Sequence, residues 1–209
     1  MSKIDICNQS LALILSNPIS SLDDLSSKEA RFCSLFYDQC RKSLLRMFPF
    51  NFSIKKTQPA TIPDIATYDW TYAYQYPLDC LYLMSVSPFP SLNAATFTTS
   101  GLSVSDITKF DVNLTSDSAY KVIYSNIENA YITYASDVED TTKFDDLFSE
   151  TLSYFLALKL AMSLSGDNDI IRTQKAMFNE SLNVCKELNA QEGNTLEPVH
   201  DNYVRARRN

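Results

Sequence analysis

Glycine and histidine are scarce in this 209-residue chain, and their scarcity excludes several kinds of site. The three glycines, Gly101, Gly166 and Gly193, stand far apart, whereas P-loops and dinucleotide fingerprints need clustered glycines. The single histidine, His200, lies beside Asp201 in a polar C-terminal stretch, where nothing would hold it against a substrate as a general base must be held. The sequence therefore indicates no catalytic residue, no bound cofactor and no enzyme.

The cysteines lack the spacing of a metal site. Cys7, Cys33, Cys40, Cys80 and Cys185 contain no Cys-x-x-Cys pair, whereas a zinc site needs several soft ligands close together. Two of them, Cys33 and Cys40, are spaced to share one face of a helix, which favours core packing. We expect five free thiols and no metal.

Long apolar runs and a basic charge are also missing. No run approaches the ~20 residues that span a bilayer, and residues 1–5 lack the charged-then-apolar plan of a signal peptide, so we expect a cytoplasmic protein with no membrane contact. The net charge of −7 argues against wrapping nucleic acid, because phosphate binding needs Lys and Arg. An acidic surface would still let DNA slide past it.

Two amphipathic helices are predicted at the start of the chain. Residues 2–17 form the first, which Pro18 ends, and Ser26 with Glu29 forms a capping box for a second that Pro49 breaks. The short loop between them predicts antiparallel packing. The expected apolar stripes are Ile4, Cys7, Leu11 and Ile14, then Ala30, Cys33, Tyr37, Cys40, Leu44 and Met47.

Between Phe52 and Ala135 the pattern changes to short alternating runs rich in Thr, Tyr and Pro, which predicts a small β domain. Residues 121–124 and 130–134 flank a loop at 125–129 and predict a β-hairpin.

Helical spacing returns after Asp137. Gly166 is predicted to stop a third, most buried helix, Asp167 to cap a fourth, and Gly193 to close it. The stripes are Phe144, Leu147, Phe148, Leu152, Phe155, Leu158 and Met162, then Ile171, Gln174, Phe178, Ser181, Cys185 and Leu188.

These elements predict an α+β fold. It is an antiparallel helical bundle of about four helices with an inserted small β domain and an extended C-terminal tail. The expected boundaries are a helical hairpin at 1–51, the β domain at 52–136, C-terminal helices packing on the hairpin at 137–193, and the tail at 194–209.

Two residue patterns each have a structural and a functional interpretation. Neighbouring carboxylates such as Asp145-Asp146 lie at expected loops or helix starts, whereas a glycosidase needs two carboxyls converging across a cleft, so helix capping is favoured. Tyr72, Tyr74 and Tyr76 share one face of a strand and could stack on bases or saccharides. Without interleaved basic residues, burial against the helical layer or a subunit interface is favoured.

Three places in the chain, the last made of two stretches, carry a resemblance to a known family. They are Pro49-Phe50-Asn51-Phe52 after a helix that follows the loop 19–23, Tyr76-Pro77-Leu78-Asp79-Cys80-Leu81, and the stretches 134–140 and 144–150. In order and spacing they resemble the head-to-tail adaptor family of short-tailed bacteriophages, the tail tubular protein A type. The chain departs from the family where Phe50 replaces a frequent tryptophan and Tyr82 a frequent arginine.

The resemblance implies a structural virion protein, assembled in the host cytoplasm. Twelve copies would form a ring between the portal and the tail nozzle, and would extend the channel through which DNA passes without sequence-specific binding. The C-terminal tail would dock on the portal, with Tyr203 as an anchor and Arg205, Arg207 and Arg208 as donors to carboxylates. From charge pattern alone, arginines in a terminus are more often merely solvated.

Two other functions stay open at this point. A virion-associated cell-wall hydrolase would need a cleft with converging carboxylates or a metal site. A non-viral helical scaffold would use its β insertion to bind a partner.

Overall fold

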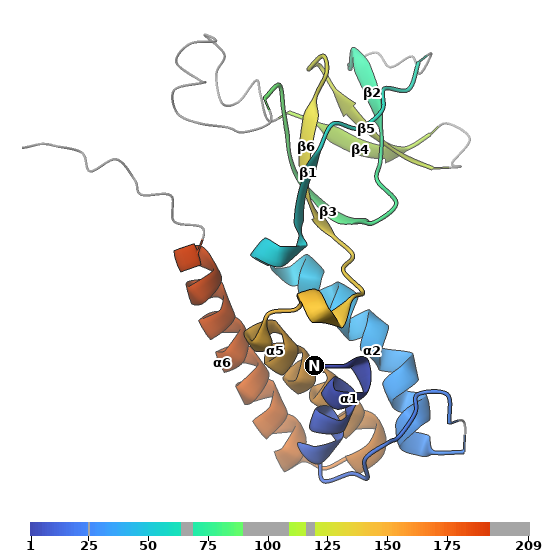
Figure 1. Cartoon of the computed structure of the whole chain (residues 1–209), viewed down its shortest axis with the longest axis vertical. Coiled ribbons are helices and arrows are strands. Elements are labelled where there is room, and N and C mark those ends of the chain that lie inside the picture. Colours follow the sequence, from blue (N-terminus) through green and yellow to red (C-terminus); the bar gives the residue numbers. More distant parts are fainter. Residues whose placement is uncertain (25, 64–68, 90–108, 116–119, 193–209) are drawn as a thin grey trace, which may run out of the picture.

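The computed structural model of the chain describes residues 1–24, 26–63, 69–89, 109–115 and 120–192. Helices form one end of the molecule and two small antiparallel sheets form the other (Figure 1). Within the described residues there are four α-helices, and all the strands lie between the second and the third. The predicted α+β fold is confirmed, while the predicted tail lies outside the described residues.

The first helix, α1 (Lys3–Ala12), ends earlier than its apolar stripe indicates. The Ser16 amide donates to the Leu11 carbonyl at 3.0 Å, and the Leu15 amide donates to the Ala12 carbonyl at 3.1 Å. These two bonds form a Schellman motif, in which Leu15 takes a left-handed φ of 58°. The predicted end at Pro18 is therefore wrong.

The second helix, α2 (Lys28–Met47), begins one residue later than predicted. Its cap is Ser27, whose hydroxyl accepts from the Ala30 amide at 3.2 Å. Ser26, the predicted cap, instead donates its hydroxyl to Asp24 at 2.6 Å, so the predicted capping box is wrong.

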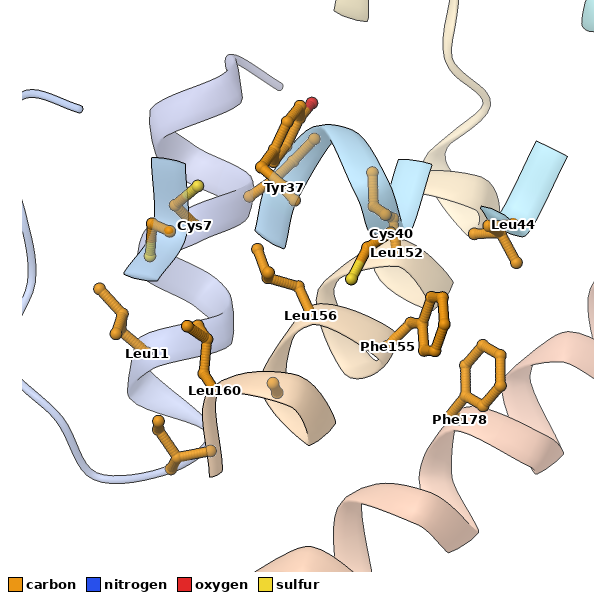
Figure 2. Packing of buried hydrophobic residues seen from close by; sticks show 14 of the residues in the cluster. Cys7, Leu11, Tyr37, Cys40, Leu44, Leu152, Phe155, Leu156, Leu160 and Phe178 are labelled. Carbon is orange, nitrogen blue, oxygen red and sulfur yellow. The ribbon is translucent and has the colours of Figure 1, made fainter. Parts of the chain in front are cut away.

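The helix α5 (Asp146–Leu160) is the centre of the bundle and packs on α1, α2 and α6 (Asn168–Glu192) (Figures 1 and 2). The helical stretch Asp146–Ser165, which is α5 with the π-helical turn that follows it, is long and apolar enough to cross a membrane, contrary to our expectation from sequence, but its position in the core accounts for that composition. α1 packs mainly on α5 rather than on α2. The buried apolar core of the bundle includes Ile6, Cys7, Leu11, Tyr37, Cys40, Leu44, Phe148, Leu152, Leu156, Leu160 and Phe178.

Predicted stripe residues at the ends of three helices are exposed. Met47 is 53% exposed because the chain leaves the bundle at the end of α2, and Arg41 and Leu45 are buried instead. Met162 is 52% exposed because residues 161–165 form a π-helical turn (η3), whose extra residue per turn rotates the face. Leu188 is 40% exposed, near the C-terminal end of α6.

The connection between α5 and α6 follows the sequence prediction. Gly166 has a φ of 68° and donates its amide to the Ala161 carbonyl at 2.8 Å. Asp167 then accepts from the Asp169 amide at 2.8 Å, which caps α6. The predicted closing glycine, Gly193, lies outside the described residues.

The β domain consists of two three-stranded antiparallel sheets with the orders β1-β6-β3 and β2-β5-β4. Their side chains meet in a shared core that contains Tyr74, Leu83, Ile123 and Ile132. The strands that lead into and out of the domain, β1 and β6, are hydrogen-bonded neighbours. The bounds are β1 Ile54–Thr57, β2 Tyr72–Gln75, β3 Cys80–Ser87, β4 Asp111–Leu114, β5 Lys121–Ser125 and β6 Tyr131–Ser136, with 3-10 turns η1 at Asn51–Ser53 and η2 at Thr141–Lys143.

The predicted hairpin between β5 and β6 is wrong. Each of these strands is the central strand of its own sheet and already has a partner on both sides. The chain between them therefore crosses from one sheet to the other, through Asn129 at a left-handed φ of 53°.

All five cysteines are free, as expected, and four of them are buried. Burial raises the pKa of the Cys40 thiol to about 12. The pKa of Cys7 is also raised, chiefly by its hydrogen bond with Cys33 across the contact between α1 and α2. These thiols act as small apolar residues of the core.

We predict that Leu15→Gly stabilises the protein. Leu15 is 89% exposed and contributes little packing, while its left-handed backbone is unfavourable for any residue with a Cβ. Relief of that strain should add about 0.5–1 kcal/mol to the free energy of unfolding in urea. Ala12→Gly is the control, because Ala12 is an exposed residue of α1 with helical backbone and the variant should lose stability. A destabilised Leu15→Gly variant would contradict the assigned motif.

Candidate interaction surfaces

The tail residues predicted to dock on a partner, Tyr203, Arg205, Arg207 and Arg208, lie outside the described residues. Candidate surfaces are therefore sought on the bundle, on the β domain and on the segment that joins them. We call this joining segment the neck, and define it as residues 48–53 and 136–148.

The neighbouring carboxylates of the sequence include several helix caps. Asp145 accepts from the Leu147 amide at 3.1 Å, and Asp140 accepts from the Thr142 amide at 3.0 Å. Hydrogen bonds from Thr142 hold the pKa of Asp140 below its usual range, whereas a general acid needs a raised pKa. Among the described residues, no group of three His, Cys, Asp or Glu side chains is placed to hold a metal ion.

The three alternating tyrosines lie on one face of the strand β2 and its continuation, as predicted. Tyr74 is buried between the two sheets, with Tyr72 and Tyr76 packed half-buried beside it. The Tyr74 hydroxyl donates to the Ile127 carbonyl at 2.5 Å and accepts from the Ala130 amide at 3.3 Å. Tyr74 is thus buried in the core of the β domain, with the other two tyrosines half-buried against it, which corrects the expectation of burial against the helical layer.

Five phenylalanines form a continuous cluster in the neck. Phe50 lies 4.9 Å from Phe148 and 5.1 Å from Phe48 between ring centroids, and both pairs meet edge to face. Phe52 and Phe144 complete the cluster, with centroids 5.0 Å and 4.8 Å from Phe148. Such edge-to-face pairs contribute about 0.5–1.5 kcal/mol each beyond their buried area. The cluster fastens the start of α5 to the segment that follows α2.

A buried ion pair lies beside this cluster. Arg41 is 1% exposed, and its Nη1 donates to Asp137 and to the Val138 carbonyl, the latter at 2.7 Å. Lys42 also contacts Asp137, at 3.0 Å. Burial alone would raise the pKa of Asp137, but hydrogen bonds from Arg41 and Lys42 outweigh it and hold the pKa below its usual range. α2 is thereby fixed to the strand-to-helix connection.

This ion pair was missed from the sequence. Arg41 follows Tyr37 by four residues, so it falls on the buried face of α2, and this position was the available signal. A polar residue at a core position indicates a buried partner, but the partner's identity depends on the tertiary structure.

A second polar network ties β3 to the neck. Asp79 accepts from Lys55 and from the Tyr134 hydroxyl, the latter at 3.0 Å, and its carbonyl accepts from the Asp137 amide at 2.7 Å. Burial and the hydrogen bond to Asp79 raise the pKa of Tyr134 to about 12. The Ser136 hydroxyl donates to a carbonyl of η1 at 2.8 Å. The two chain segments that connect the bundle to the β domain are thus joined by hydrogen bonds of both backbone and side chains.

The segments that carry the family resemblance therefore meet at one place. The stretch 49–52 supplies Phe50 and Phe52, the stretch 76–81 supplies Asp79, and the stretches 134–140 and 144–150 supply Asp137 and Phe148. Between them they build most of the neck. The sequence presented them as separate motifs, and the structure brings them into contact.

A groove of about 540 Å³ lies on the β domain beside the segment 76–81. Tyr76, Pro77, Leu78 and Tyr120 line it, and Leu78 is fully exposed. Lys121 lies 5.3 Å from the centre of the Tyr76 ring. Exposed apolar and aromatic side chains gathered in one hollow make it a candidate protein-binding surface.

A scan against protein-family models finds no match for this chain, and a search of curated proteins finds no similar sequence.

We predict that Asp137→Asn destabilises the protein at neutral pH by about 3 kcal/mol, because it removes the carboxylate that is hydrogen-bonded to the buried Arg41 guanidinium and leaves only the longer contacts to Asp38 at 3.5 Å and Glu139 at 3.7 Å. The only tryptophan, Trp70, lies in the β domain, whereas far-ultraviolet circular dichroism reports mainly the helices. In urea the two signals should unfold together in the wild type and separately in the variant.

The contribution of Asp137 to the free energy of unfolding depends on pH, and the direction of its pKa shift sets the sign of that dependence. The folded pKa of Asp137 is depressed, so its contribution is present above the unfolded value of about 4 and is lost as the pH falls through the folded pKa. Asp137→Asn should thus lose less stability on acidification than the wild type. Lys42→Ala, which removes the half-exposed partner, is the control and should change stability by less than about 1 kcal/mol. Equal effects of the two variants would contradict the assigned role.

Proposed function

We propose that this protein is a structural virion protein, a subunit of a head-to-tail adaptor ring of the tail tubular protein A type. The ring connects the portal to the tail nozzle and extends the DNA channel. The observation that carries the proposal is the neck, because the segments that resemble the family are the ones that build it.

The neck suits a subunit that must join two other components. It fixes the β domain at one end of the bundle through the phenylalanine cluster, the Arg41–Asp137 pair and the paired strands β1 and β6. Because the bundle and the β domain are held in a fixed orientation, a contact made by the bundle also positions the β domain. The bundle is then available for lateral packing, and the groove beside Leu78 for a neighbouring component.

The charge of the chain supports this role. A net charge of −7 gives a ring little attraction for phosphates, so that DNA passes through without being held. The C-terminal tail, with Tyr203, Arg205, Arg207 and Arg208, is proposed to reach the portal and bind carboxylates there.

The hydrolase alternative is less well supported. The capping carboxylates Asp140 and Asp145 bind backbone amides, and Asp79 and Asp137 are engaged by cations. A non-viral helical scaffold fits the same fold, and the portal experiment separates it from an adaptor.

We predict that the purified protein, at ordinary concentrations, is largely monomeric and forms a closed ring when mixed with its portal. Particle imaging and co-sedimentation measure this. A chain ending at residue 193 should melt like the full chain but fail to sediment with the portal, because the tail supplies docking and little core. Unchanged portal binding by the shortened chain would refute the docking role of the tail. A full chain that never joins a portal would overturn the adaptor role.

A further inference from the structure

The outward face of α2 carries a line of exposed basic residues. Lys28, Arg31, Leu35, Lys42 and Arg46 recur at helical spacing, all are exposed, and they lie on the side of the helix opposite its buried stripe. Four of the five are cationic, and Leu35, 64% exposed, lies among them. We call this line the basic ridge.

A hollow follows the first half of the basic ridge. It has a volume of about 670 Å³ and is lined by Lys28, Arg31, Phe32, Ser34 and Leu35. Neither Lys28 nor Arg31 forms an ion pair within the described part of the chain. The hollow therefore presents apolar side chains beside two unneutralised cations.

An apolar stripe with acidic neighbours runs along α6. Met177, Val184 and Leu188 are 43%, 40% and 40% exposed, and steps of seven and four residues place them on one side of the helix. Glu180 and Glu187 are exposed along one edge of this side. At about 100° per residue, the lysines of α6 fall on the opposite side. We call these five residues the acidic stripe.

The two surfaces lie on different helices, and α5 lies between those helices (Figure 1). Two copies that met ridge to ridge would bring cations together, and two that met stripe to stripe would bring carboxylates together. Ridge against stripe instead pairs opposite charges and covers apolar side chains on both partners. A contact between two different surfaces repeats from copy to copy, and closes into a ring when the rotation permits.

We propose that the basic ridge of one copy binds the acidic stripe of the next copy. Met177 and Val184 enter the hollow beside Leu35, and Glu180 and Glu187 pair with Arg31 and Lys28. This inference rests on the proposed ring and names the surfaces that form it.

The size of the contact predicts that the free protein associates only weakly. Stable interfaces bury about 1,600 Å² in total, whereas one helix laid along another covers less than that. Each contact is then weak alone, and ring closure on a portal adds the contacts together.

The test uses two charge-reversal variants of the full chain, without any portal. Lys28→Glu/Arg31→Glu makes both surfaces acidic, and Glu180→Lys/Glu187→Lys makes both basic. Lys175→Glu/Lys186→Glu is the control, because it changes the net charge as much as the first variant does, but on the other side of α6. Thermal melts of all variants verify folding. Sedimentation velocity at high protein concentration and low salt measures association.

We expect the wild type and the control to form species larger than a dimer, which salt weakens. Each reversal variant alone should associate at least about tenfold more weakly. An equimolar mixture of the two variants should recover the wild-type association, because each surface then meets its opposite on the other variant.

Three results would overturn the proposal: a wild type that stays monomeric under these conditions, a mixture that does not recover, or a mixture that stops at a dimer. The outcome is independent of the adaptor role. If the mixture recovers association but the protein does not bind a portal, the result supports the proposed interface and contradicts the adaptor function. If the Lys28→Glu/Arg31→Glu variant still forms portal-bound rings, the result contradicts the proposed interface but not the adaptor function.

Discussion

A single buried cation, Arg41, places the strongest constraint on how this chain is arranged. Taking a guanidinium out of water is unfavourable by several kcal/mol unless carboxylate and carbonyl oxygens surround it. Here those oxygens come from Asp137 and Val138, far along the chain and beyond the whole β domain. The observed position of α2 is therefore stabilised by residues that follow the whole β domain in the sequence.

The phenylalanine cluster supplies what the ion pair lacks. Arg41 and Asp137 fix orientation through directed hydrogen bonds, while the five rings around Phe148 supply buried apolar area. The paired strands β1 and β6 add a backbone ladder to the same place. Three kinds of interaction thus converge on the neck. For a ring subunit, this would let lateral contacts of the bundle set the position of the β domain.

Much of the helical part followed from local signals. Pro49 and Gly166 act within one turn of backbone, as does the Asp167 cap, and the three-and-four spacing of apolar residues identifies a buried face without knowledge of the partner. Errors occurred where a contact from elsewhere intervened. The Ser26 hydroxyl is hydrogen-bonded to Asp24 rather than to an amide of α2, and the π-helical turn rotated Met162 outward.

By itself, the sequence determined the fold class, the number of helices and the approximate extent of the β insertion, because each depends on periodicity within a segment. Only the tertiary structure decided which strands pair, where the three tyrosines are buried, and that Arg41 meets Asp137. The spacing of β5 and β6 is equally compatible with a hairpin and with a crossing between sheets. Strand pairing and buried charge depend on residues distant along the chain, such as Ile54 and Ala135, and spacing within a segment contains no information about them.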